Sequence, residues 1–161
     1  MDKKTQNHNI ADNAGVRIPP PLIALFLLAL GLILDYFFPA PFLTPGYSLL
    51  FGLPVCLLAV VVFVKSAWLF KVNETEIKPW KPTSVIIKTG PYRYSRNPIY
   101  LGFALFLIGI ALIANTLWGL LTTVIFVFVI TKFVIAREES YLEKKFGPEY
   151  LEYKSQVRRW F

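Results

Sequence analysis

A short polar stretch at residues 89–102 holds the side chains best suited to chemistry. It carries three tyrosines and two arginines and leads directly into a long apolar run. Gly90-Pro91 is a turn dipeptide, while Pro98 disfavours helical geometry at Asn97 and suits the first turn of a following helix. Ionisable groups at the rim of an apolar helix can form a functional site. Alternatively, the tyrosines and arginines can serve only to anchor the helix at a membrane surface. The loop alone leaves both interpretations open.

The acidic pair Glu138-Glu139 lies in a second polar stretch, at residues 137–159. Carboxylates can pair with an ammonium group and accept hydrogen bonds from ribose hydroxyls. The aromatic faces of the first stretch can stack on a purine or attract a cation such as a sulfonium. These are the interactions that the two stretches offer together if the fold brings them to one place.

The apolar residues that must position these stretches are gathered in long runs. The chain has 161 residues, 55% of them hydrophobic, and its length suits one domain. Since about 20 consecutive apolar residues cross a bilayer, we predict an all-α integral membrane fold with about four transmembrane helices, the last two forming a helical hairpin. The predicted spans are residues 20–38, 47–70, 99–114 and 118–136.

The remaining segments are predicted to lie outside the bilayer. Residues 1–18 read as a flexible cytoplasmic tail, and residues 19–161 as a single membrane domain whose cytoplasmic site pieces are 84–102 and 137–159. Within residues 84–102 the run Ser84-Val85-Ile86-Ile87 is expected to be extended. The C-terminal stretch is predicted to form two amphipathic helices on the membrane surface, separated by Gly147-Pro148. The second of these places on one face the residues Tyr150, Tyr153, Val157 and Trp160.

The distribution of basic residues predicts the topology. Outside the predicted spans, lysines and arginines lie before the first span, between the second and third spans, and after the fourth. The connections between the first and second spans and between the third and fourth spans have none. The positive-inside rule therefore places both termini and the central loop in the cytoplasm, and brings residues 97–100 near Glu138-Glu139. Basic residues beside membrane spans also account for the net charge of +7, so a nucleic-acid partner is not expected. One histidine and one cysteine, His8 and Cys56, make a zinc site improbable.

The two polar stretches also resemble a known family. The run Gly-Pro-Tyr-Arg-Tyr-Ser-Arg-Asn-Pro-Ile-Tyr-Leu-Gly, a helical hairpin, and then Glu-Glu-x-x-Leu-x-x-x-Phe-Gly-x-Glu-Tyr-x-x-Tyr is similar to the isoprenylcysteine carboxyl methyltransferases. Phospholipid N-methyltransferases share the pattern. The resemblance covers about residues 84–159 and implies an integral membrane enzyme. Its cofactor would be S-adenosyl-L-methionine, and its acceptor would be a small lipophilic molecule or lipid that enters from the bilayer.

The resemblance also implies roles for individual residues. Glu138 would hold the ammonium group of the cofactor, and Arg96 and Glu139 would be catalytic. The cofactor would be bound by Ser84, Val85, Ile86, Ile87, Tyr92, Asn97, Pro98, Ile99, Tyr100 and Glu138.

Two departures from the family pattern bear on the acceptor. The family motif is usually Arg-His-Pro, and here Asn97 replaces the histidine, which excludes a titratable base at that position. Eukaryotic members also carry a substrate-contacting arginine at the position matched here by Val134. Carboxylate O-methylation of an isoprenylcysteine-type acceptor and N-methylation of a phospholipid or other amine therefore both remain open. A non-catalytic membrane assembly protein is the alternative from another class, and a transporter is a weaker one because Asp35 and Lys65 both lie near span ends.

Overall fold

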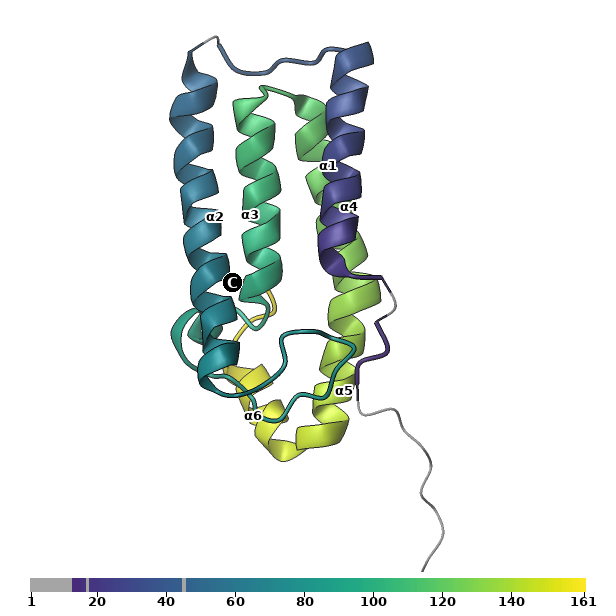
Figure 1. Ribbon diagram of the computed structural model, residues 1–161, viewed down its shortest axis with the longest axis vertical. Coiled ribbons are helices and arrows are strands. Elements are labelled where there is room, and N and C mark those ends of the chain that lie inside the picture. Colours follow the sequence, from purple (N-terminus) through teal and green to yellow (C-terminus); the bar gives the residue numbers. More distant parts are fainter. Residues whose placement is uncertain (1–12, 17, 45) are drawn as a thin grey trace, which may run out of the picture.

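The computed structural model describes residues 13–16, 18–44 and 46–161, in which every regular element is helical (Figure 1). Most of the predicted tail 1–18 lies outside the described residues. The elements are, in chain order, α1 (Pro20–Phe37), α2 (Tyr47–Val72), the 3-10 helix η1 (Gly90–Arg93), α3 (Pro98–Ile113), α4 (Leu117–Ile130), the π-helical segment η2 (Thr131–Ile135), α5 (Ala136–Phe146) and α6 (Pro148–Gln156). Residues 84–87 form no strand, and Val85 lies in a bend, so the predicted extended run stays a prediction.

Long apolar helices form the body of the molecule and make it an integral membrane protein. Within the described residues, three helices are long and apolar enough to cross a bilayer, namely Pro20–Phe37, Tyr47–Val72 and Leu117–Phe146. The shorter α3 has 16 residues, or about 24 Å of helix, against a hydrocarbon core of about 30 Å. These helices begin and end within two residues of the predicted spans, except at the end of the fourth.

The fourth span differs from the prediction because its helix does not stop at residue 136. α4, η2 and α5 follow one another without a break over 30 residues. The apolar part ends near Ala136, so the charged residues 137–146 extend the same helix beyond the bilayer core. We expected a separate helix lying on the membrane surface. The continuous helix instead holds Glu138 and Glu139 rigidly beneath the spans.

Small residues let α2 and α3 pack closely along their length (Figure 1). A Cβ atom on Gly52 would lie 2.8 Å from the Gly109 carbonyl oxygen, and one on Gly109 would lie 2.9 Å from the Cys56 amide nitrogen. Close backbone approach of this kind is a common way for helices to associate in membranes. α1 packs mainly against α4, so the four apolar helices form two pairs joined by the contact of α3 with α4.

The connections at one end of the bundle are held by hydrogen bonds to backbone groups, including one from the Ala40 amide to Asp35 Oδ1 at 3.2 Å. The Asn115 side chain accepts hydrogen bonds from the amides of Phe42 and Leu43, at 3.1 and 2.7 Å, and donates one to the Leu43 carbonyl at 2.9 Å. The Trp118 indole donates to the Phe38 carbonyl at 2.7 Å. These bonds join the tip of the α3–α4 hairpin to the α1–α2 connection.

At the opposite end, the C-terminal segment folds back on the loop before α3. The Arg96 amide donates to the Arg158 carbonyl at 3.0 Å, and the Asn97 side-chain amide donates to the Arg159 carbonyl at 3.0 Å. The prediction of a helix reaching Trp160 is wrong, because α6 ends at Gln156 and Val157 is extended. An extended segment can expose its carbonyl groups to the loop, whereas a helix would use them internally.

Candidate functional site

A cavity of about 380 Å³ lies at the end of the bundle where α1 begins, α2 ends and α3 begins. Its wall is mostly apolar and aromatic, with contributions from the spanning helices, the 76–87 loop, α5 and α6. A few polar groups converge on it, chiefly Arg96, Asn97, Tyr100, Glu138 and Glu139. An apolar cavity of this size with a few convergent polar groups is typical of a binding site for a small molecule.

The structure brings most of the predicted site residues together in this wall. They are Val85, Ile86, Ile87, Tyr92, Arg96, Asn97, Ile99, Tyr100, Glu138 and Glu139. Ser84 and Pro98 do not line it. The Ser84 amide donates to the Thr75 hydroxyl at 2.9 Å, and Pro98 is buried against a second cavity behind the loop. Their predicted contact with a cofactor therefore finds no support in the geometry.

A short hydrogen bond joins the two polar stretches at the cavity. The Tyr100 hydroxyl, in the first turn of α3, donates to Glu138 Oε1 at 2.6 Å. Glu138 is partly buried in the cavity wall, and this burial raises the pKa of its carboxyl to about 7, although the hydrogen bond from Tyr100 acts in the opposite direction. Near neutral pH, this group is therefore poised to become fully ionised when a cation approaches it.

The neighbouring carboxylate, Glu139, has different partners. It lies between Arg96, at 3.2 Å, and Arg159, whose Nε and Nη2 atoms donate to its two oxygens at 3.0 and 2.6 Å. Arg96 and Glu139 are buried, and Arg159 is partly exposed. Among the described residues, no hydrogen-bond acceptor meets the Nε and Nη1 atoms of Arg96. Because Arg96 also lines the cavity, these two buried donors lie beside the space that a ligand would occupy.

Aromatic residues fix the turn that carries Tyr92. The Tyr153 hydroxyl donates to the Tyr92 carbonyl at 2.7 Å, and the ring of Tyr92 lies edge-on to Phe70, with 5.9 Å between ring centroids. Tyr150 and Tyr153 are both buried, as their predicted position on one helical face requires. The fold thus uses α6 to hold the loop in front of α3.

Sequence reasoning missed several residues of the cavity wall. Ala14, assigned to the flexible tail, lines the cavity and donates from its amide to the Pro79 carbonyl at 3.2 Å. Arg137 Nη1 donates to the Gly15 carbonyl at 3.0 Å. Trp80 and Phe63 also line the cavity. The only available signal was the Pro79-Trp80-Lys81-Pro82 turn, whose aromatic residue has no reason to lie in a solvated loop.

Comparison with known proteins identifies several relatives. The family model of the phospholipid methyltransferases matches residues 47–149. The protein-S-isoprenylcysteine O-methyltransferase of Saccharomyces cerevisiae is 47% identical over 76 residues, which cover 45% of this chain and 30% of the yeast protein. An uncharacterized protein of Haemophilus influenzae is 56% identical over 54 residues, which cover 30% of this chain and 86% of that protein.

A solved structure agrees with the fold. The eukaryotic intramembrane Ras methyltransferase ICMT (isoprenylcysteine carboxyl methyltransferase) matches with a TM-score of 0.63 and 28% sequence identity, over 88% of this chain and 51% of that one. The chain therefore matches about a third of the yeast enzyme and about half of the solved one. Since the family model covers well over half of this chain, the chain belongs to the phospholipid methyltransferase family.

Proposed function

We propose that this protein is an integral membrane methyltransferase that transfers a methyl group from S-adenosyl-L-methionine to the carboxylate of a lipophilic, isoprenylcysteine-type acceptor. The observation that carries the proposal is the cavity in which Tyr100 and Glu138 meet beside the unpaired donors of Arg96. Family membership and the similarity to the two isoprenylcysteine methyltransferases support it.

The residues present fit the cofactor. Glu138 offers a carboxylate for the cofactor's ammonium, and Tyr100 orients that carboxylate through its 2.6 Å hydrogen bond. The aromatic rings of Tyr92 and Trp80 lie in the same wall, where they can stack on a purine or attract a sulfonium. Val85, Ile86 and Ile87 supply an apolar edge that excludes water. When bound, the cofactor supplies an electrophilic methyl group, so that transfer depends chiefly on in-line positioning and a dry site.

Arg96 gives the site its preference for an anionic acceptor. Its Nε and Nη1 atoms are buried without partners among the described residues, and a buried unpaired donor is costly unless a ligand satisfies it. The two donors point in different directions, so an acceptor carboxylate can accept a charge-assisted hydrogen bond from one of them. Val134, which replaces the arginine of eukaryotic relatives, is buried in the core and offers no alternative cation. Glu139 then acts by holding Arg96 in place, which refines its predicted catalytic role.

The cavity is proposed to face the cytoplasm. It lies at the end of the bundle that carries the basic connection 71–97 and the basic C-terminal segment, whereas the opposite connections have no lysine or arginine. The aromatic and apolar residues Phe63, Phe70 and Phe103 line its side toward the spans, where the hydrophobic part of an acceptor would lie.

Calorimetric titration of the detergent-purified protein with S-adenosylmethionine and S-adenosylhomocysteine tests the cofactor site. We expect saturable binding of both, weakened in Tyr100→Phe, which removes only the hydroxyl that orients Glu138. Absence of binding in a folded sample would favour the non-catalytic membrane protein. The test of the acceptor follows the methyl group into an S-farnesyl cysteine derivative, with the corresponding carboxamide as the matched control.

N-methylation of a phospholipid amine is the second candidate, favoured by the description of the family that matches. Such an amine must lose a proton before it attacks, and a carboxyl with a pKa of about 7 is suited to accept one. Methyl transfer to phosphatidylethanolamine but not to the farnesyl cysteine would replace the first proposal with this one.

A further inference from the structure

A second cavity, of about 490 Å³, lies behind the loop that precedes α3. The four residues 95–98 separate the two cavities, because Arg96 and Asn97 line the first while Ser95 and Pro98 line the second. The Ser95 hydroxyl donates to the Arg159 carbonyl at 3.3 Å, which closes this wall from the C-terminal side. The second cavity is therefore a separate compartment and not part of the cofactor site.

Two cations without counterions line the second cavity. Lys65, from α2, and Arg93, from η1, are both exposed, and neither forms an ion pair in the part of the chain that the structure describes. The cavity lining contains no aspartate or glutamate. A concave surface with two unpaired cations and no carboxylate is complementary to an anion.

The position of Lys65 indicates what kind of anion this is. Lys65 lies seven residues before the end of α2 at Val72, which corresponds to about 10 Å along the helix axis. A lysine there can extend its ammonium group to the boundary between hydrocarbon and headgroups. Val61 and Leu101, from the adjoining turns of α2 and α3, supply an apolar floor on the bilayer side of the cations.

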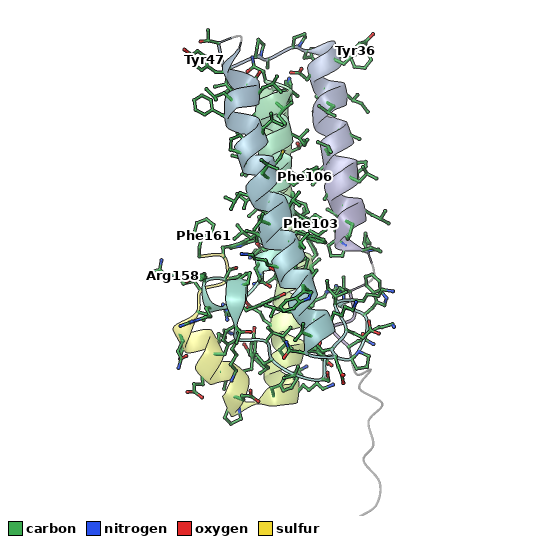
Figure 2. The ribbon with its side chains drawn as sticks, turned by 60° about the vertical axis from the view of Figure 1, so that its left-hand side comes forward. Tyr36, Tyr47, Phe103, Phe106, Arg158 and Phe161 are labelled. Carbon is green, nitrogen blue, oxygen red and sulfur yellow. The ribbon has the colours of Figure 1, made fainter. Side chains whose placement is uncertain are left out.

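Aromatic side chains complete the cavity at the same level. Tyr94 and Phe161 are largely exposed, at 77% and 76%, and Trp160 packs against the core while lining the cavity. Figure 2 shows Phe161 nearer to the spanning helices than Arg158, on the same side of the molecule. The cavity thus combines apolar, aromatic and cationic side chains, the kinds of residue that meet at a membrane interface.

We propose that the second cavity binds the phosphate headgroup of an anionic phospholipid. Lys65 and Arg93 pair with the phosphate, Tyr94 and Trp160 lie at the level of the glycerol backbone, and the acyl chains run along Val61 and Leu101. The lipid is a bound component of the protein and is not the methyl acceptor, since residues 95–98 separate it from Glu138. The binding does not depend on the proposed methyl transfer.

Native mass spectrometry of protein released from nanodiscs of mixed phosphatidylglycerol and phosphatidylcholine tests this site without any cofactor. We expect wild type to retain phosphatidylglycerol in preference to phosphatidylcholine. The double variant Lys65→Gln/Arg93→Gln should retain roughly 30-fold less, given about 1 kcal/mol for each of the two basic residues at a membrane surface. The matched control is Lys132→Gln/Lys144→Gln, which removes the same charge from residues outside both cavities and should behave as wild type.

Three results would overturn the proposal. The first is equal retention of phosphatidylglycerol by the Lys65/Arg93 variant and its control. The second is equal retention of both lipids by wild type, because the site would then not distinguish an anionic headgroup from a zwitterionic one. The third is a dimer in wild type that the Lys65/Arg93 variant lacks, because a second copy of the chain would then occupy the cavity.

Discussion

The two helix pairs are joined at both ends of the bundle, but by different kinds of interaction. At one end, Asn115 and Trp118 tie the connections together by hydrogen bonds to backbone groups, and no lysine or arginine takes part. At the other end, long connections surround a cavity with carboxylates and an arginine that has unpaired donors. Among the described residues, the first end leaves one neutral buried hydroxyl, Thr116 Oγ1, without a partner, while the second leaves two donors of a cationic guanidinium unpaired beside a cavity. This difference locates the candidate site without reference to any relative.

The largest effect on stability should come from replacing Glu139, to which we assign the structural role of holding Arg96 in place. Glu139→Gln leaves the buried Arg96 guanidinium without a countercharge, which should cost about 3 kcal/mol of stability. Thermal unfolding in detergent, followed by circular dichroism, measures this loss. If Glu139→Gln kept wild-type stability and lost only methyl transfer, Glu139 would be catalytic, as the family resemblance implies.

Glu138→Gln should weaken cofactor binding instead of folding. Loss of a charge-assisted hydrogen bond of about 1.5–3 kcal/mol corresponds to roughly a 10- to 150-fold rise in the dissociation constant for S-adenosylhomocysteine. Calorimetry measures the affinity, and an unchanged unfolding temperature separates this variant from Glu139→Gln. Glu143→Gln, on the same helix but outside the cavity wall, is the matched control and should bind normally.

Asn115→Ala tests whether the end of the bundle at the α3–α4 hairpin tip is independent of the cavity. It removes three hydrogen bonds and places alanine at a φ of +52°, which should cost about 2 kcal/mol of stability. Asn115→Gly loses the same bonds without the backbone penalty and should be less affected. Cofactor affinity should equal that of wild type in both, and a change would show that the two ends are coupled.

The smallest effect is a pH dependence that only the cavity end should show. Since the pKa of the Glu138 carboxyl is raised to about 7, it is protonated at lower pH and must release a proton to bind an ammonium. Affinity for S-adenosylhomocysteine should therefore fall about tenfold between about pH 8 and pH 6. Titrations in Glu138→Gln should show no such fall; a parallel decrease there would assign the pH dependence to another group.

The sequence was sufficient to predict the membrane spans and the meeting of the two polar stretches. Long apolar runs and the one-sided distribution of basic residues left few other arrangements, and the contact of Tyr100 with Glu138 follows from them. The start of α3 at Pro98 was predictable because proline both disfavours the helix before it and suits the first turn.

Other features depended on tertiary contacts that local patterns do not encode. The onset of charge after Ala136 resembles the start of a surface helix, yet the backbone continues without a break from α4. Val157 is extended because the carbonyls after it bind the loop, although its apolar spacing fits a helix. Ser84 and Pro98 match the family motif, but a motif does not specify which side of the chain faces the cavity.

The hydrogen bonds from Asn97 and Ser95 to the Arg159 carbonyl also set an order of events during biosynthesis. About 60 residues separate these partners. At a synthesis rate of roughly 5–20 residues per second, Arg159 is therefore made some 3–12 seconds after the loop that it binds. During that interval, the helices α3 to α6 must be made, and α3 and α4 must be inserted. The ribosome therefore delivers the membrane anchor first and the closed cavity last, so that an incompletely inserted chain has no assembled site with which to bind a nucleoside.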